Sequence, residues 1–297
     1  MKTMIGFGVL KRFAKGLKNL YMKDIKFRIG FTLFIAIIVV GLLSLFSPPY
    51  YKTWYYFKKD LPPSFQSLDL LLGTTTNGRP VFWSLTNAII NSLAIAAVTT
   101  LIASHLGLVI GLVSGIRGGV VDRVLMTITD TFVTIPGFPL LFVLSMILKD
   151  YLTIPLLGLM ISITSWPWPA RQVRAIVLSL RERDFVLTAR LSGAGTFKII
   201  VQELLPYVLG WHLINATNTV LYSIGSEAGL AILGLSILSE DTLGTMIYWA
   251  QHYGALYRGK LWWIMSPVTM LIIIFVSLYL ISFSLQEYFN PRLRRLR

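Results

Sequence analysis

The sequence predicts an all-α membrane protein that crosses the bilayer repeatedly, with six transmembrane helices. Of its 297 residues 55% are hydrophobic and only 13% are charged. Soluble domains carry roughly one quarter charged residues, so this composition, with a mean hydropathy of +0.69, is typical of a polytopic membrane protein. The net charge of +14 would suggest a nucleic-acid partner in a soluble protein, but the basic residues gather here at the ends and in particular loops. We therefore expect the lipid membrane, and no nucleic acid, as a partner.

Six apolar runs mark the spans, because about 20 apolar residues are needed to cross a hydrocarbon core of about 30 Å. Pro136 and Pro139 should bend the third span, and the fourth is short. The predicted spans are 29–46, 88–113, 125–148, 154–168, 208–238 and 261–285. They divide the chain into a cytoplasmic N-terminal segment 1–28, a first transmembrane helix 29–46, an external segment 47–85, a five-helix core 86–286 and a cytoplasmic tail 287–297.

The basic residues indicate the orientation of these spans. The first 28 residues hold eight of them and no cleavable signal. With six spans, 20 of the 27 Lys and Arg residues fall on the side that holds both termini and the loop 171–206, and 7 fall on the other side. Positive charge is enriched on the cytoplasmic side of membrane proteins, so both termini and this loop are predicted to be cytoplasmic.

Small residues recur every four positions in the second span, at Ala103, Gly107, Gly111 and Gly115. Small side chains at this spacing let two helix backbones approach closely in lipid. We interpret the stripe as a helix-packing surface.

Two acids lie within predicted spans, Asp130 and Glu227. A carboxylate in hydrocarbon is costly, so each is expected either to pair with a neighbouring group or to line a polar pathway. Glu227 could also cap a half-helix after a break at Gly225-Ser226. Neutral polar residues in the spans suit an uncharged or zwitterionic solute, and the full set of pathway candidates is Asn87, Asn91, Asn215, Asn218, Tyr222 and Glu227.

No catalytic residues and no metal site are predicted. The chain has no Cys, and His105, His212 and His252 are scattered without ligand spacing. It also lacks a Gly-rich phosphate-binding loop, so any ATP would be bound by another chain. An intramembrane enzyme would need a convergent catalytic set, and an ion-coupled secondary transporter would need clustered intramembrane acids.

The loop 171–206 is a mixed-charge, helix-compatible stretch in an otherwise apolar chain. Asp184 is a plausible helix cap, Gly193 and Gly195 interrupt the helix, and a second helix restarts before Pro206. Such a helix–bend–helix knob suits a groove in a soluble partner. Its expected contact residues are Asp184, Phe185, Ala189, Arg190, Gly193, Ala194, Gly195, Lys198, Leu205 and Pro206.

With these motifs the chain resembles the inner-membrane permease subunits of the dipeptide/oligopeptide branch of binding-protein-dependent ABC importers. Their cytoplasmic loop carries Glu-Ala-Ala, three residues and Gly, followed by Leu-Pro. Ala189, Gly193 and Leu205-Pro206 match that pattern, whereas Leu187 and Thr188 stand where the family has Glu and Ala. The resemblance covers residues 72–292 in order, through Gly73, Gly78-Arg79, Gly118-Gly119, Asp122, Asp130, Pro136, Trp166-Pro167, Arg171, Arg174, Glu227, Gly234, Trp262-Trp263, Pro267 and Asn290-Pro291-Arg292.

This resemblance implies a type I ABC importer permease fold in the cytoplasmic membrane, with the loop 171–206 as the ATPase-coupling loop. It further implies a second homologous permease subunit, two ATPase subunits and an external solute-binding protein. The chain itself would be no enzyme and hold no cofactor, with ATP and Mg in the partner ATPases. Transport would proceed by alternating access. The expected cargo is short peptides first and oligosaccharides a close second; nickel or another small solute is the alternative within the fold.

Overall fold

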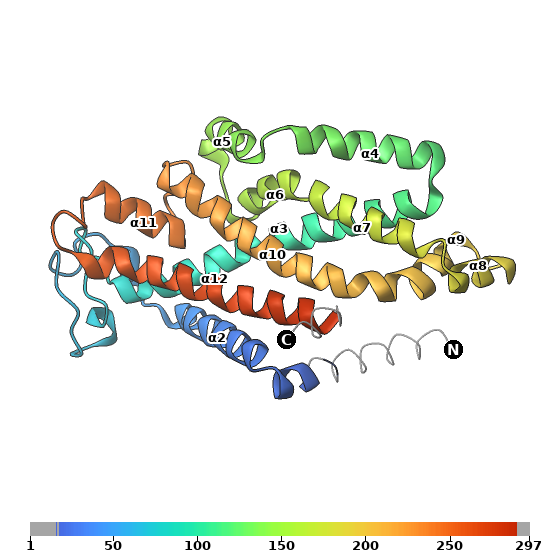
Figure 1. Ribbon diagram of the computed structural model, residues 1–297. Helices are drawn as coiled ribbons and strands as arrows, with labels where there is room; N and C mark the ends of the chain where they lie inside the picture. Colours follow the sequence, from blue (N-terminus) through green and yellow to red (C-terminus); the bar gives the residue numbers. More distant parts are fainter. Residues whose placement is uncertain (1–15, 17, 290–297) are drawn as a thin grey trace.

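The computed structural model describes residues 16 and 18–289, and these form an elongated bundle of helices (Figure 1). The all-α prediction is confirmed: the described residues contain no strand, only an isolated bridge between Thr74 and Pro80. The main helices are α2 (Ile25–Leu42), α3 (Val81–Arg117), α4 (Gly119–Thr134), α5 (Gly137–Ile147), α6 (Ile154–Ser165), α7 (Pro167–Leu180), α8 (Asp184–Leu191), α9 (Thr196–Lys198), α10 (Leu205–Ile232), α11 (Leu243–His252) and α12 (Leu261–Phe289).

The predicted count of six spans is not confirmed as such. Four helical stretches in the described part of the chain are long and apolar enough to cross a membrane: Ile25–Phe46, Val81–Arg117, Thr196–Ile232 and Leu261–Phe289. Helices α4 and α5 together make a fifth if they are one span, bent by 79°. The fourth predicted span is the 12-residue helix α6, which is followed directly by α7.

The bend predicted in the third span lies at Pro136, between α4 and α5. A residue that precedes proline is pushed away from helical geometry, and Ile135 is extended with φ −79° and ψ 123°. Pro139 lies in the first turn of α5, where a proline needs no hydrogen-bond donor, so it adds no second break.

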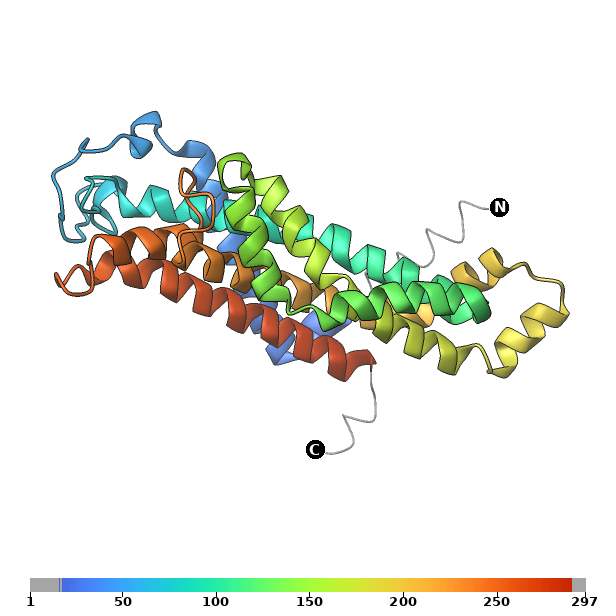
Figure 2. The same cartoon turned by 90° about the horizontal axis from the view of Figure 1, so that it is seen from above.

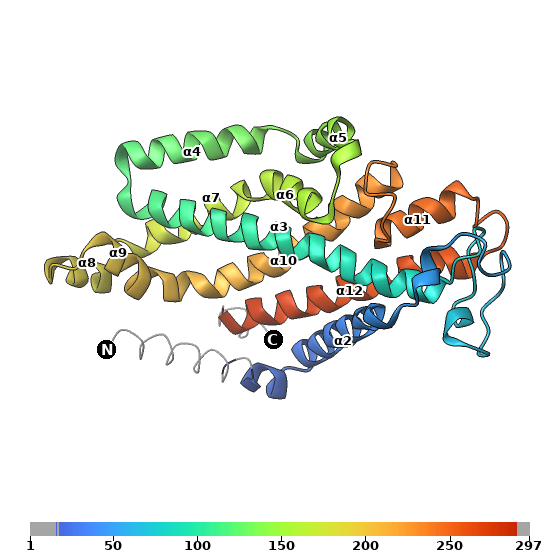
Figure 3. The same cartoon turned by 180° about the vertical axis from the view of Figure 1, so that it is seen from behind.

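Helix α3 is the central element and packs along α7 (Figure 3). The small-residue stripe makes this contact. A Cβ added at Gly111 would lie 2.6 Å from the Ala170 carbonyl oxygen, and one at Gly107 would lie 2.8 Å from that of Trp166. Only glycine allows so close an approach, which confirms the predicted packing role.

Several boundaries differ from the prediction. Helix α2 begins four residues before residue 29, α3 begins within the segment 47–85, and residues 287–289 belong to α12. The predicted break at Gly225-Ser226 is wrong, because α10 runs unbroken to Ile232 and Glu227 therefore caps no half-helix. The helix that restarts before Pro206 continues through it: α9, a π-helical segment (Ile199–Leu204) and α10 form one continuous stretch. Proline lacks the backbone donor that an α-helical register would use, and the π-helical turn lies just before it.

The two ends of the bundle carry different structures. Helices α8 and α9 project at one end, and the loops around residues 47–80 and 253–260 lie at the opposite end (Figures 1 and 2). Most of the predicted N-terminal segment, including its basic residues up to Lys15, lies outside the described residues. So do residues 290–297, with the Asn290-Pro291-Arg292 motif.

Candidate functional site

Two cavities of about 660 and 410 Å³ open on the same face of α10. Trp168, Asn215 and Asn218 line both, so the two form a continuous surface that we call the α10 polar face. The larger cavity reaches along α10 and α12 and is also lined by Gln172, Pro206, Tyr207, Gly210, Trp211, Ile214, Gln286 and Phe289. The smaller one faces α5, α6 and α7 and is also lined by Phe132, Val133, Ile135, Gly137, Thr164, Ser165, Pro167, Pro169, Thr219 and Tyr222.

The α10 polar face carries no Asp, Glu, Lys, Arg or His among its described lining residues. Its polar groups are amides and hydroxyls held in place by neighbouring helices. Asn215 donates from Nδ2 to Ser104 Oγ at 3.1 Å, and Asn218 Oδ1 accepts from Ser282 Oγ at 3.0 Å. The Tyr222 hydroxyl lies 3.4 Å from Thr164 Oγ1. The surface therefore offers neutral hydrogen-bonding groups beside aromatic rings and no fixed charge.

Three of the six pathway candidates lie on this face, and the other three do not. Asn87 Nδ2 donates to the Trp83 carbonyl at 2.9 Å, within α3. Asn91 Nδ2 donates to the Asp241 carbonyl at 2.8 Å and thereby joins α3 to the segment before α11.

Glu227 is 1% exposed and joins α10 to the start of α11. Its Oε1 accepts from Ser236 Oγ at 2.8 Å and from Thr242 Oγ1 at 2.6 Å. Thr242 is the N-cap of α11 and forms a capping box with Thr245. Of the two expected roles, this geometry corresponds to structural pairing.

Asp130 is also paired. Its Oδ1 lies 2.6 Å from Arg171 Nη2, across α4 and α7. Eight residues earlier on α4, Asp122 accepts two hydrogen bonds of 2.6 Å from Arg174 and a short one from Ser114. These pairs hold α4 on α7, next to the loop that leads to α8.

The helix–bend–helix knob forms as predicted, with one correction. Asp184 is not the N-cap of α8; Arg183 is, without a side-chain capping bond, and Asp184 is the first helical residue. An acid in the first turn still interacts favourably with the helix dipole. After α8, Gly193 has a φ of +78°, and Ala194 N donates back to the Ala189 carbonyl at 3.0 Å. This left-handed glycine with its return bond is a Schellman-type helix end.

The knob is anchored on one side and exposed on the other. Val186 is fully buried against Ile199 and Leu204. Phe185, Ala189, Ala194 and Leu205 pack on that cluster, whereas Asp184, Arg190, Gly193, Gly195, Lys198 and Pro206 are exposed. Two apolar side chains that were not predicted as contacts are also exposed, Leu191 at 90% and Phe197 at 80%. Apolar tips on a rigid polar knob are typical of a docking surface.

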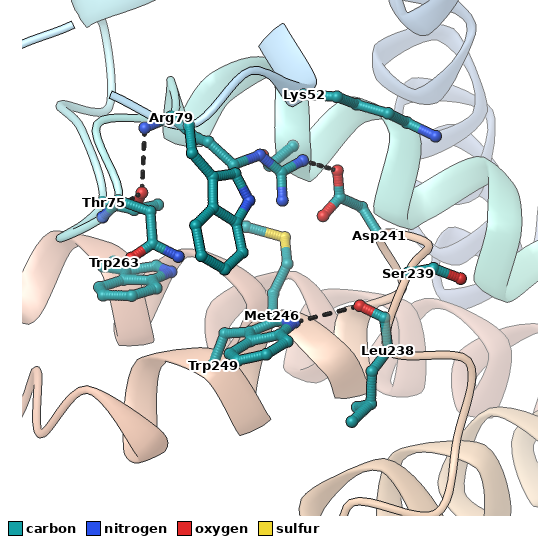
Figure 4. A pocket seen from close by; sticks show the side chains of 12 residues that line it. Lys52, Thr75, Arg79, Leu238, Ser239, Asp241, Met246, Trp249 and Trp263 are labelled. Atoms are coloured by element: carbon teal, nitrogen blue, oxygen red, sulfur yellow. Dashed lines mark hydrogen bonds and ion pairs between the residues drawn. The ribbon is translucent and has the colours of Figure 1, made fainter. Parts of the chain in front are cut away.

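An ion pair that sequence reasoning missed lies at the opposite end of the bundle (Figure 4). Arg79 Nη2 is 2.5 Å from Asp241 Oδ2, and Asp241 is 5% exposed. Burial raises the pKa of the Asp241 carboxyl, and the Arg79 guanidinium opposes that rise. The only hint in the sequence is the acid pair Glu240-Asp241 directly after an apolar stretch.

Comparisons with known proteins show the family and the fold of the chain. Residues 107–295 match the family described as "Binding-protein-dependent transport system inner membrane component". The chain is 33% identical over 265 residues to the nickel transport system permease protein NikC of Escherichia coli (strain K12), covering 87% of this chain and 94% of that protein. It is 26% identical over 274 residues to the oligopeptide transport system permease protein OppC of Bacillus subtilis (strain 168), covering 88% of this chain and 85% of that one.

A solved structure of the MetNI methionine ABC transporter in an inward-facing conformation shares the fold. The match has a TM-score of 0.54 and 22% sequence identity, and it covers 73% of this chain and 97% of the other.

Proposed function

This chain belongs to the family of binding-protein-dependent transport system inner membrane components, and from that premise we propose that it lines the membrane pathway of an ATP-driven importer of short peptides. Membership makes it a permease of an ABC importer, related to oligopeptide and nickel permeases, with the type I importer fold in the inner membrane. The proposal is carried by one observation, the absence of ionisable acids and bases from the described lining of the α10 polar face.

A peptide suits this surface because its backbone offers amides at regular spacing, and neutral amides and hydroxyls on the wall can pair with them. A fixed charge on the wall would bind some peptides too tightly and repel others. Trp168 is 60% exposed and Tyr222 41% exposed, so both rings are available to apolar side chains of a solute.

The knob would couple this pathway to two ATPase subunits, which bind ATP and Mg. Its second half is continuous with α10, since Thr196–Ile232 is a single helical stretch that runs from the knob past Tyr222. Closure of the ATPases would displace the knob and tilt α10 with it, which changes the α10 polar face as alternating access requires. A second homologous permease would supply the facing wall, and an external solute-binding protein would deliver the cargo.

Nickel is disfavoured by the same surface. A metal ion passing along it would need imidazole or carboxylate ligands. The fold does bring His105 and His212 together, with ring centroids 5.0 Å apart, but neither residue lines the two cavities. The aromatic rings are compatible with sugar rings, so an oligosaccharide is the second candidate.

Two measurements test the proposal. The purified chain should bring down two ATPase subunits and a second permease; a chain that transports solute alone, driven by an ion gradient, would contradict it. The partner binding protein should then bind di- to pentapeptides more tightly than β-linked oligosaccharides or Ni²⁺. If only oligosaccharides bind tightly, the importer assignment stands, but its cargo is oligosaccharides rather than peptides. If only a metal ion binds tightly, both the peptide and the oligosaccharide assignments are wrong.

A further inference from the structure

A separate cavity of about 150 Å³ lies at the end of the bundle opposite the knob (Figure 4). Segments far apart in sequence build its wall: residues 52–79, the start of α3, the segment 238–241, α11 and α12. Since a water molecule occupies about 30 Å³, the cavity has room for a small molecule rather than for an oligomer. It does not share a lining residue with the α10 polar face.

Three tryptophan rings, with Leu238 and Met246, form the apolar part of this wall. Trp54 meets Trp249 edge to face with centroids 6.5 Å apart, and Trp263 lines the cavity from α12. The backbone beside Trp54 is strained: Tyr55 has a φ of +61°, and its N–H donates to the Asn77 carbonyl at 2.6 Å. A non-glycine residue in this left-handed conformation is strained, and such strain is typical of ligand sites.

The polar part of the wall holds unused hydrogen-bonding capacity. Ser84 Oγ has no partner among the described residues although the side chain is only 3% exposed. The ion pair uses Arg79 Nη2 and Asp241 Oδ2. Within the described chain, the other oxygen of Asp241 accepts no hydrogen bond and Arg79 Nη1 donates none. Figure 4 shows both of these atoms directed toward the side of the cavity where Met246 lies. Buried polar atoms are nearly always paired, so the buried and unpaired Ser84 Oγ points to a ligand in this cavity.

We propose that this cavity binds a small zwitterion, an α-amino acid with an apolar side chain. Its carboxylate would accept from Arg79 Nη1, its ammonium group would donate to the free Asp241 oxygen and to Ser84 Oγ, and its side chain would lie among the tryptophan rings. Both cations of the wall are paired, Arg79 with Asp241 and Lys52 with Glu240, so the wall has no net charge. A cation or an anion alone would leave its own charge uncompensated there, whereas a zwitterion can meet a positive and a negative partner at once. Occupation would add contacts between the segment 52–79 and α11.

The test is calorimetric titration of the purified transporter complex, without its binding protein and without ATP, so its result does not depend on the cargo of the importer. Leucine should bind saturably. N-acetyl-leucine lacks the ammonium charge, and leucine amide lacks the carboxylate. Each should bind more weakly than leucine, by roughly tenfold or more, because one charge-assisted hydrogen bond is lost. Glucose, which is neutral and of similar size, should not bind.

Ser84→Ala should weaken leucine binding roughly tenfold. Ser145→Ala is the matched control, since Ser145 Oγ is also buried without a partner among the described residues but does not line the cavity; it should bind leucine like the unmodified chain. A melting curve confirms that both variants are folded, and if Ser84→Ala is not, the two leucine derivatives decide alone. No saturable leucine binding, equal binding of leucine and its derivatives, or binding of glucose instead would each overturn the proposal.

Discussion

Arg174 of α7 and Asp122 of α4 form a two-point ion pair in which Nε and Nη2 donate to the two carboxylate oxygens at 2.6 Å each. Such a paired geometry fixes direction as well as distance. Arg181, the C-cap residue of α7, donates from Nη1 to the Gly115 carbonyl at 3.2 Å. The end of α7, from which the knob extends, is thus tied to both α3 and α4.

Breaking the Asp122–Arg174 pair should loosen this junction. We expect Asp122→Asn to lower stability by about 1–2 kcal/mol, since a half-buried charged hydrogen-bond pair loses its ionic part. Glu182→Gln is the control: Glu182 pairs with Arg181 but is 71% exposed, so the change should stay within about 0.5 kcal/mol. Thermal unfolding of the two variants measures the difference, and equal effects would contradict the structural role of the α4–α7 pair.

The close approach of α3 to α7 gives a sharp glycine prediction. Gly111→Ala places a Cβ 2.6 Å from both the Ala170 carbonyl oxygen and Val173 Cβ, so the helices must separate and stability should fall by about 1–3 kcal/mol. Gly225→Ala, also within a helix, meets only Phe275 Cζ at 3.6 Å and should raise stability by roughly 0.5–1 kcal/mol through its better helix propensity. A melting temperature that does not fall in Gly111→Ala would show that α3 and α7 are not packed as described.

Substitutions at two neighbouring tryptophans should have different effects, one on stability and the other on transport. Trp166 is 7% exposed and packs with Ala103 and Ala170, so Trp166→Ala should cost about 3–5 kcal/mol. Trp168 is 60% exposed and lines both cavities of the α10 polar face, so Trp168→Ala should leave the melting temperature nearly unchanged. It should lower solute uptake in vesicles while ATPase subunits still copurify. Normal uptake by a folded Trp168→Ala variant would remove this ring from the pathway.

Gly193 tests the docking role of the knob. No atom lies within 4 Å of a Cβ built there, so Gly193→Trp projects into solvent, and its positive φ costs about 1 kcal/mol. The variant should insert normally and lose ATPase association or uptake. Gly254 also has a positive φ, +63°, and equally open space at the other end of the bundle, so Gly254→Trp should keep the ATPases. Loss of the ATPases in both variants, or in neither, would refute the assignment.

The orientation of the chain is a prediction that cysteine labelling can test without background, because the sequence contains no Cys. Ser67 and Ser192 are both exposed and lie at opposite ends of the bundle. A membrane-impermeant maleimide added to intact cells should label Ser67→Cys and leave Ser192→Cys unlabelled until the membrane is opened. The reverse pattern would place the knob outside and end the proposed coupling to cytoplasmic ATPases.

The sequence alone determined the features that depend on local pattern. Apolar runs predicted the long helices, the small-residue stripe predicted a close helix contact, and Pro136 predicted a bend. Each of these patterns depends only on residues within one helical turn or one span. The same local reasoning failed where a helix continues through residues that often end one. It expected a break at Gly225-Ser226, but α10 runs unbroken from Leu205 to Ile232.

Only the tertiary structure decided which polar residues act together. Asn215 and Asn218 look no different in sequence from Asn87 and Asn91, yet the first two share a cavity wall with Trp168 while the others bond to nearby backbone. Arg79 and Asp241 are separated by 162 positions and meet because the segment before α3 folds onto the segment before α11. Such pairs depend on which helices lie side by side, and that is set by the packing of the whole bundle rather than by the residues around each partner.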